Sequence, residues 1–255
     1  MAIGGNEYVP DLGVNPATAQ MYDKHFTGSN GSLLKTRIAA AAKQVGINPG
    51  LLAASMLAEH RADSYTKRTG EVDGWDIGTD DYKESKADIE RLVPAARALK
   101  PIRYAPATNE NGRTIAEVPV FKAEDAVLAS AVYLKYAEVK ARRAMSEMGG
   151  SFDRLTAEHQ FALTRYGVNA GQGAMKQRIM ELLGTRRLHG QYVHDQKSKE
   201  FLQFDPGKRV HGLEQFNRHK PQRAATAHTA QAIHLSQKIF GISPAGAGDS
   251  LLFIR

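Results

Sequence analysis

Apolar residues recur at helical spacing along much of the chain, and glycine-containing breaks separate the stretches. Ser32 is an expected N-cap for a first helix, in which the apolar positions are Leu33, Leu34, Ile38, Ala41, Ala42 and Val45. Asn48-Pro49 begins a second helix, because Asn is a favoured cap and Pro suits the first helical position. This second helix is almost wholly apolar from Leu51 to Ala58, and Glu59 follows directly.

After Glu59 the pattern predicts more helices and little strand. Residues 61–84 are polar and contain three glycines, so we expect a loop or a short hairpin there. A short strand pair is expected within 100–120. Helices are expected over about 85–99, 122–147, 156–166, 174–183 and 224–240, with a turn at 169–173. The fold class predicted from this pattern is mainly α.

Composition divides the chain into three parts. Residues 1–31 are rich in Gly, Asn, Pro and Thr and are predicted to form an irregular N-terminal arm. Residues 32–187 hold most of the helical pattern and form the predicted main domain. Residues 188–255 are a basic extension with six of the nine histidines and one predicted helix. No pair of these tail histidines has the His-x-x-x-His spacing of a helical zinc site, so no metal or other cofactor is expected.

Charge and cysteine content narrow the function classes. The chain has 34 Lys and Arg against 27 Asp and Glu, a net charge of 34 − 27 = +7. A basic surface suits nucleic acid, anionic lipid or an acidic polymer such as peptidoglycan. Because the basic residues are spread thinly, nucleic acid is not the expected partner. The absence of cysteine excludes disulfides, thiolate metal sites and a cysteine nucleophile.

The sequence also bears on location. The start, Met1-Ala-Ile-Gly-Gly-Asn-Glu, has neither the basic beginning nor the apolar run of a signal peptide. No stretch approaches 18 consecutive apolar residues, so no membrane span is expected. We therefore expect a protein made in the cytoplasm that reaches any substrate outside it by another route.

Glu59 is the residue to which the pattern assigns chemistry. It follows an apolar helix and precedes a polar, glycine-rich loop. Partial burial at such a boundary would raise the pKa of the carboxyl group, because burial disfavours the charged form. A carboxylic acid that stays protonated near neutral pH can donate a proton to a glycosidic oxygen. The alternative is that Glu59 is a surface residue at the end of a helix.

Three motifs in order resemble the superfamily of lytic transglycosylases and goose-type lysozymes. Residues 47–59, Ile-Asn-Pro-Gly-Leu-Leu-Ala-Ala-Ser-Met-Leu-Ala-Glu, resemble its apolar helix ending in the catalytic Glu. Residues 124–136 resemble its long central helix, and residues 161–173 resemble its helix ending in Tyr-Asn-Ala-Gly-x-Gly. The resemblance covers about residues 32–184. It implies a lysozyme-like, two-lobed helical domain with the sugar cleft between the lobes, and peptidoglycan as the substrate.

The chain also departs from this family's pattern. His60 stands where the family commonly has Ser. The segment 74–81, Gly-Trp-Asp-Ile-Gly-Thr-Asp-Asp, replaces a Gly-Leu-Met-Gln segment, and Gly167-Val168 separates Tyr166 from Asn169. The chain is thus similar to a divergent member. The expected substrate-binding residues are Tyr166 and Asn169, carried over by the resemblance, and His60 and Trp75, which lie beside Glu59 and in the replaced segment.

The aspartates of the replaced segment bear on the reaction type. Hydrolysing lysozymes use a second carboxylate, whereas lytic transglycosylases manage with one Glu. Asp76 is the favoured second carboxylate, and Asp80 and Asp81 are its alternates. The competing interpretation is that these aspartates only form turns. Trp75, the only Trp, is interpreted either as a sugar-stacking platform or as a core residue.

Three functions fit these observations. The first is a peptidoglycan-cleaving glycosidase that uses Glu59 as general acid, either a muramidase or a lytic transglycosylase forming 1,6-anhydro ends. The second is an inactive lysozyme-like module that binds cell wall or a partner protein, and the third is a basic helical adaptor. Delivery by a phage particle or a secretion machine is expected for the first, with action in the periplasm or on the wall. An immunity or inhibitor protein is then an expected partner.

Overall fold

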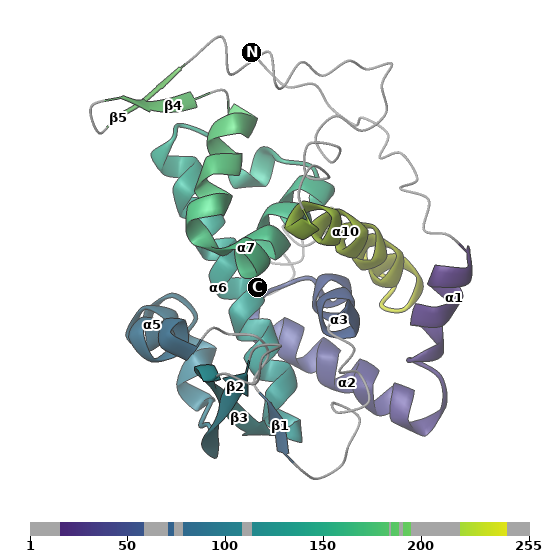
Figure 1. Cartoon of the computed structure of the whole chain (residues 1–255). Coiled ribbons are helices and arrows are strands. Elements are labelled where there is room, and N and C mark those ends of the chain that lie inside the picture. Colours follow the sequence, from purple (N-terminus) through teal and green to yellow (C-terminus); the bar gives the residue numbers. More distant parts are fainter. Residues whose placement is uncertain are drawn as a thin grey trace, which may run out of the picture.

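The computed structural model describes residues 16–58, 71–73, 79–108, 114–183, 185–188, 191–194 and 220–243. These residues are mainly helical, as predicted, with two small antiparallel sheets (Figure 1). None of the described helices combines the length and the apolar character needed to cross a membrane.

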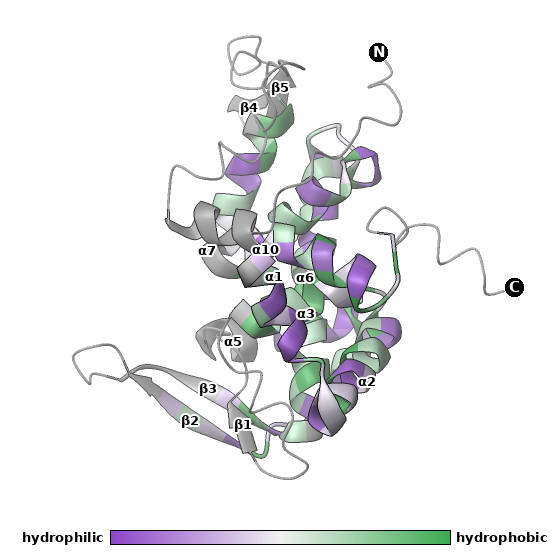
Figure 2. Ribbon diagram, turned by 90° about the vertical axis from the view of Figure 1, so that its right-hand side faces the viewer, coloured by the Kyte–Doolittle hydropathy of each residue, from purple (hydrophilic) through white to green (hydrophobic). Residues whose placement is uncertain are grey.

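The first three helices are α1 (Pro16–Lys24), α2 (Gly28–Val45) and α3 (Pro49–Ala58). α2 begins before the predicted cap Ser32, with Thr27 at the N-cap position. It ends at Gly46, whose φ of 69° lies in the left-handed region that favours glycine. Figure 2 shows hydrophilic and hydrophobic residues interleaved along α2, as expected of a helix with one face on the core. The predicted beginning of α3 at Asn48-Pro49 is confirmed.

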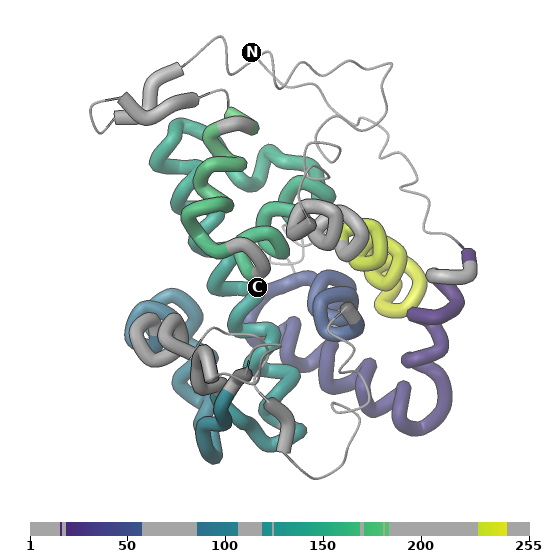
Figure 3. Tube along the Cα trace, in the orientation of Figure 1, coloured from purple at the N-terminus to yellow at the C-terminus, as the bar shows by residue number. Residues whose placement is uncertain are grey.

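The predicted irregular arm over 1–31 differs from the structure where residues are described. Residues 16–24 of this segment form helix α1. The helix is held in place because Tyr22 packs against the main core. Asp23 joins α1 to the C-terminal helix α10 (Lys220–Lys238), accepting from His234 Nε2 at 2.9 Å and from Lys238 Nζ at 2.5 Å. The trace in Figure 3 places α1 beside α10 although more than 200 residues separate them. Sequence periodicity does not reveal such long-range contacts.

The predicted strand pair is confirmed and a third strand joins it. β2 (Arg103–Thr108) and β3 (Thr114–Lys122) pair antiparallel, with Arg103 opposite Val120. β1 (Glu71–Asp73) pairs with the other edge of β3, which gives the order β1-β3-β2. A separate hairpin, not predicted, joins β4 (Thr185–Leu188) to β5 (Gln191–His194).

The central helices lie between these sheets. α5 (Thr79–Leu92) leads into the 3-10 helix η1 (Pro94–Ala98), so the helix expected at 85–99 begins earlier than predicted. α6 (Ala123–Glu147) matches its prediction closely. The short η2 (Phe152–Arg154) precedes α7 (Ala157–Leu183), which is broken at Gly171 (φ 80°, ψ 167°). The predicted turn at 169–173 is therefore a break in the helical path.

Two apolar clusters lie along α6. The first buries α2, α3 and the N-terminal half of α6, with Ile89, Phe121, Phe161 and Leu235 from other elements. The second packs the C-terminal half of α6 against α7. Each fully buried leucine in such a cluster contributes roughly 1.5–3 kcal/mol. α6 is thus the element that both halves of the core share.

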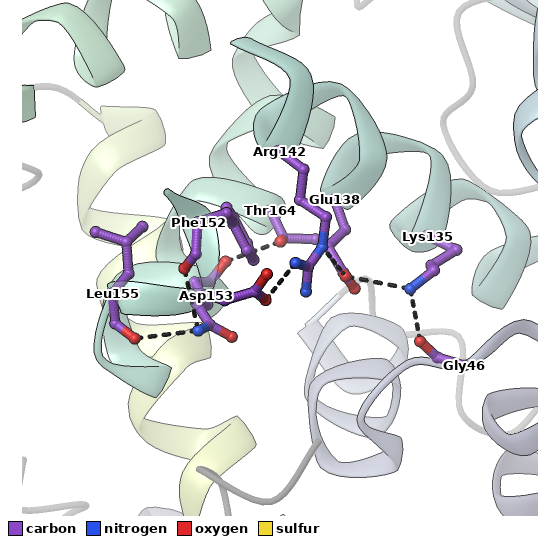
Figure 4. A network of polar contacts seen from close by, with 9 residues as sticks. Gly46, Lys135, Glu138, Arg142, Phe152, Asp153, Leu155 and Thr164 are labelled. Atoms are coloured by element: carbon purple, nitrogen blue, oxygen red, sulfur yellow. Dashed lines mark hydrogen bonds and ion pairs between the residues drawn. The ribbon is translucent and has the colours of Figure 1, made fainter. Parts of the chain in front are cut away.

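A polar network fixes α6 to its neighbours (Figure 4). Glu138, mostly buried, accepts from Lys135 Nζ at 3.1 Å and from Arg142 Nε at 2.7 Å. Lys135 also donates to the carbonyl of Gly46 at 2.8 Å, and Arg142 pairs with Asp153. Because a buried carboxylate needs such partners, the network holds the ends of α2 and η2 against α6.

Candidate functional site

The start of α3 is held by side chains from two distant parts of the chain. Asn48 Oδ1 accepts from the backbone N–H groups of Gly50 at 2.8 Å and Leu51 at 3.2 Å, which caps the helix. Ser236 Oγ of α10 lies 2.7 Å from the same oxygen and 2.6 Å from the carbonyl oxygen of Ala232, and these two acceptors share its one hydroxyl hydrogen. The C-terminal helix therefore completes the cap of α3, which the sequence did not indicate.

Gly50 allows α10 to lie directly against α3. A Cβ atom at Gly50 would lie 2.1 Å from Ser236 Oγ and 2.4 Å from the carbonyl oxygen of Ala232. Both distances are shorter than any ordinary contact, so only glycine fits this helix crossing. α10 also packs against α7, and it links the two helices.

α3 is buried along its length as the apolar pattern predicts. Every residue from Leu51 to Leu57 is buried, and the helix ends at Ala58, immediately before Glu59. The predicted site residues Glu59, His60, Trp75 and Asp76 lie outside the described residues. What the structure describes is the rigid, capped helix that precedes Glu59.

The alternates Asp80 and Asp81 lie in a helix and not in the predicted loop. Both fall in the first turn of α5, which begins at Thr79. The expectation that Asp76, with Asp80 or Asp81 as alternates, is a second carboxylate stays a prediction.

Tyr166 and Asn169 lie in the first segment of α7, before the break at Gly171. The prediction that Tyr166 stands on the last turn of a helix was wrong, because the helix continues beyond it. Tyr166 is 5% exposed and belongs to the second apolar cluster, so packing accounts for its burial. The side chain of Asn169 lies outside what the structure describes, so its expected role in binding substrate stays a prediction.

A connected polar cluster lies where α5, α6 and α7 meet. Asp88 Oδ2 accepts from Tyr136 Oη at 2.9 Å and from Lys140 Nζ at 3.0 Å, and Arg91 pairs with Oδ1. Gln172 Nε2, just after the break in α7, donates to Tyr136 Oη at 3.4 Å. The cluster therefore joins α5 to the part of α7 that follows the break at Gly171, through Tyr136 of α6.

Charge pairing explains the electrostatics of this cluster. The hydrogen bond from Lys140, with those from Tyr136 and Arg91, holds the pKa of Asp88 at about 2, although burial opposes the shift. Partial burial lowers the pKa of Lys140, but the hydrogen bonds and charge interactions with Asp88 and Tyr136 together outweigh it, so the pKa is raised. Lys140 Nζ also lies 5.3 Å from the centre of the Tyr136 ring.

The chain was compared with known families and structures. No family model, curated protein or solved structure matches it. Among the described residues there is also no group of three or more His, Asp or Glu side chains placed to hold a metal ion.

Acid unfolding should report on Asp88. Its pKa is lower in the folded chain than the ordinary 3.8, so its stabilising contribution is complete above about pH 4 and is lost as the pH falls through about 2. We expect Asp88→Asn to lower the melting temperature at pH 7 and to flatten its fall between pH 4 and 2. The measurement is the melting temperature by circular dichroism at each pH. Glu90→Gln is the control, because Glu90 makes only a 3.8 Å ion pair with Lys86 on the same helix. If the melting temperature of Asp88→Asn falls between pH 4 and 2 as steeply as that of the wild type, the lowered pKa of Asp88 is contradicted.

The sequence analysis missed the members of this cluster. Tyr136 and Lys140 are one helical turn apart on a helix that was predicted, but nothing in their spacing points to Asp88, 48 residues earlier. Gln172 lies inside the Asn-Ala-Gly-Gln-Gly segment, at the position where the family motif allows any residue. The one usable signal was the glycine on each side of Gln172, which predicted an exposed turn.

Proposed function

We propose that the chain is a peptidoglycan-cleaving glycosidase of the lysozyme-like kind, with Glu59 as the general acid. The observation that carries the proposal is the buried apolar helix α3, capped at Asn48 and ending at Ala58 immediately before Glu59. The burial and the cap of α3 support the proposal, because a general acid has to be precisely placed and α3 is the element that leads to Glu59. The three family-like motifs support the same proposal, since α3, α6 and α7 follow one another in the order of that family.

The proposed chemistry breaks the bond between N-acetylmuramic acid and N-acetylglucosamine. Glu59 donates its proton to the bridging oxygen as the bond from that oxygen to C1 of muramic acid breaks. In hydrolysis a water molecule supplies the new oxygen at C1, with Asp76 as the nucleophile or the general base. In the alternative, transglycosylation, the sugar's own 6-hydroxyl attacks C1 and no second carboxylate is required.

Hydrolysis is the favoured alternative because the segment 74–81 supplies carboxylates. Asp76 is the favoured carboxylate, and Asp80 and Asp81, which lie in α5, are its alternates. Two apolar clusters sharing α6 also suit the two-lobed arrangement that the resemblance implies. An inactive wall-binding module would share these features, so activity has to be measured.

The masses of the digestion products test both the function and the reaction type. Purified peptidoglycan treated with the protein should yield fragments with reducing muramic acid ends. Transglycosylation would instead yield 1,6-anhydro ends, one water lighter. We expect Asp76→Asn to lower hydrolysis at least ~100-fold if Asp76 is the partner carboxylate. Anhydro products with Asp76→Asn fully active would identify a lytic transglycosylase, and intact glycan would refute the proposed function.

A further inference from the structure

The orientation of the Gln172 amide follows from the hydrogen bonds around Tyr136. Asp88, ionised at any ordinary pH, can only accept hydrogen bonds, so the single hydroxyl hydrogen of Tyr136 is donated to it. The Tyr136 oxygen can then only accept. The amide group of Gln172 must therefore turn its N–H side toward Tyr136, as the 3.4 Å contact has it.

This orientation leaves the other end of the amide available. Tyr136 engages Nε2 and not Oε1 of Gln172, and the residue is exposed. Within the part of the chain that the structure describes, no group donates a hydrogen bond to Oε1. A Cβ atom at Gly171 or at Gly173 would meet nothing within 4 Å, so the space around the turn is open. An amide held at one end and open at the other is a directed acceptor.

We propose that Gln172 is a sugar-binding residue whose Oε1 accepts a hydrogen bond from the acetamido N–H of an N-acetylated sugar, with Tyr136 as the positioning residue that fixes its amide. The inference rests on the proposed function and goes further, because it names the group on the substrate that is read. Asp88 and Lys140 act through Tyr136. Asp88 accepts from both Lys140 and Tyr136, so the Tyr136 oxygen is left to accept from Gln172. Anchoring the amide before binding reduces the conformational entropy lost when the sugar binds.

The acetamido group suits this acceptor better than a carboxylate or phosphate would. A carbonyl oxygen repels anions, so the site selects a donor. Each N-acetylated sugar carries one amide N–H that can donate to it. The contribution of one neutral hydrogen bond corresponds to about threefold to tenfold in affinity.

Calorimetric titration with the β-1,4-linked pentamer of N-acetylglucosamine tests the assignment. All proteins would carry Glu59→Gln so that the sugar is not consumed. Gln172→Ala should weaken binding about threefold to tenfold. Tyr136→Phe keeps the ring but removes the anchoring oxygen, so it should weaken binding to a similar degree. Gln44→Ala, an exposed glutamine on α2, is the matched control and should change nothing.

The double variant separates positioning from general damage. If Tyr136 acts only through Gln172, then Tyr136→Phe with Gln172→Ala should bind no more weakly than Gln172→Ala alone. Melting temperatures are measured for every variant, and Gln172→Ala should melt like the parent. Losses that multiply in the double variant would overturn the role of Tyr136.

The failure of this inference can be told from failure of the proposed function. Equal pentamer affinity of the parent and Gln172→Ala would refute the sugar-binding role while the function stands. A dissociation constant above about 1 mM for the pentamer and the parent protein, which carries Glu59→Gln alone, would also refute the sugar-binding role. Failure of the wild-type protein to cleave peptidoglycan would refute the function on which it rests.

Discussion

A Glu59→Gln variant should clear a suspension of purified cell walls at least ~100-fold more slowly than the wild type. The substitution keeps the size and shape of the side chain but removes the proton that the glycosidic oxygen must receive. Because only the proton is lost, the melting temperature should stay within a few degrees of the wild type. The fall in turbidity with time gives the rate.

The control for this experiment is Glu147→Gln. Glu147 is more than half exposed and makes a 3.6 Å ion pair with Lys176, far along α6 from the end of α3. Exposed pairs of this kind contribute little to stability, so both activity and folding should be unchanged. If Glu59→Gln clears walls as fast as the control, Glu59 is not the general acid and the proposed mechanism fails.

The second large effect is expected at Gly50, where Gly50→Ala should destabilise the fold by about 3 kcal/mol. Helix propensity alone would favour alanine by about 1 kcal/mol. The clash is larger, because the new Cβ would lie 2.4 Å from the carbonyl oxygen of Ala232, a backbone atom that moves only if α10 moves. Chemical denaturation followed by circular dichroism measures the change.

Gly173→Ala is the matched control for Gly50→Ala. Gly173 is also helical, but a Cβ there would meet nothing within 4 Å, so alanine should be neutral or stabilising by up to about 1 kcal/mol. Adding Ser236→Ala to Gly50→Ala removes the 2.1 Å clash with Oγ but not the clash with the backbone, so recovery should be partial. If Gly50→Ala and Gly173→Ala are equally stable, α10 does not pack against α3 closely enough at Gly50 to exclude a Cβ atom.

Local signals made part of the fold predictable. α3 and α6 were predicted almost to the residue, because Asn48-Pro49 and Gly149-Gly150 are strong boundary signals and the apolar positions recur regularly. α1 and the early start of α5 were missed. α1 is stabilised by contacts with α10, and such long-range packing overrides a weak local pattern.

The candidate site was harder to predict than the helices for a similar reason. Glu59 could be proposed from the sequence because the apolar helix directly precedes it, and its role stays a prediction. The Asp88–Tyr136–Gln172 cluster joins three elements that are 48 and 36 residues apart, and no local spacing marks it. Asp80 and Asp81 were assigned to a loop because residues 70–81 contain four aspartates and three glycines, a composition typical of loops. In the structure the helix α5 begins within this segment, at Thr79.

The contact between Ser236 and Asn48 sets the order in which the chain can fold. Its two partners are 188 residues apart, so a ribosome must synthesise the chain through residue 236 before Ser236 can bond to the Asn48 cap. Contacts of such high sequence separation form slowly, because a long loop must close first. α3 can therefore reach its final packing only after translation has passed residue 236. Premature termination anywhere before α10 would expose the face of α3 around Gly50, which α10 normally covers, to solvent and to other chains.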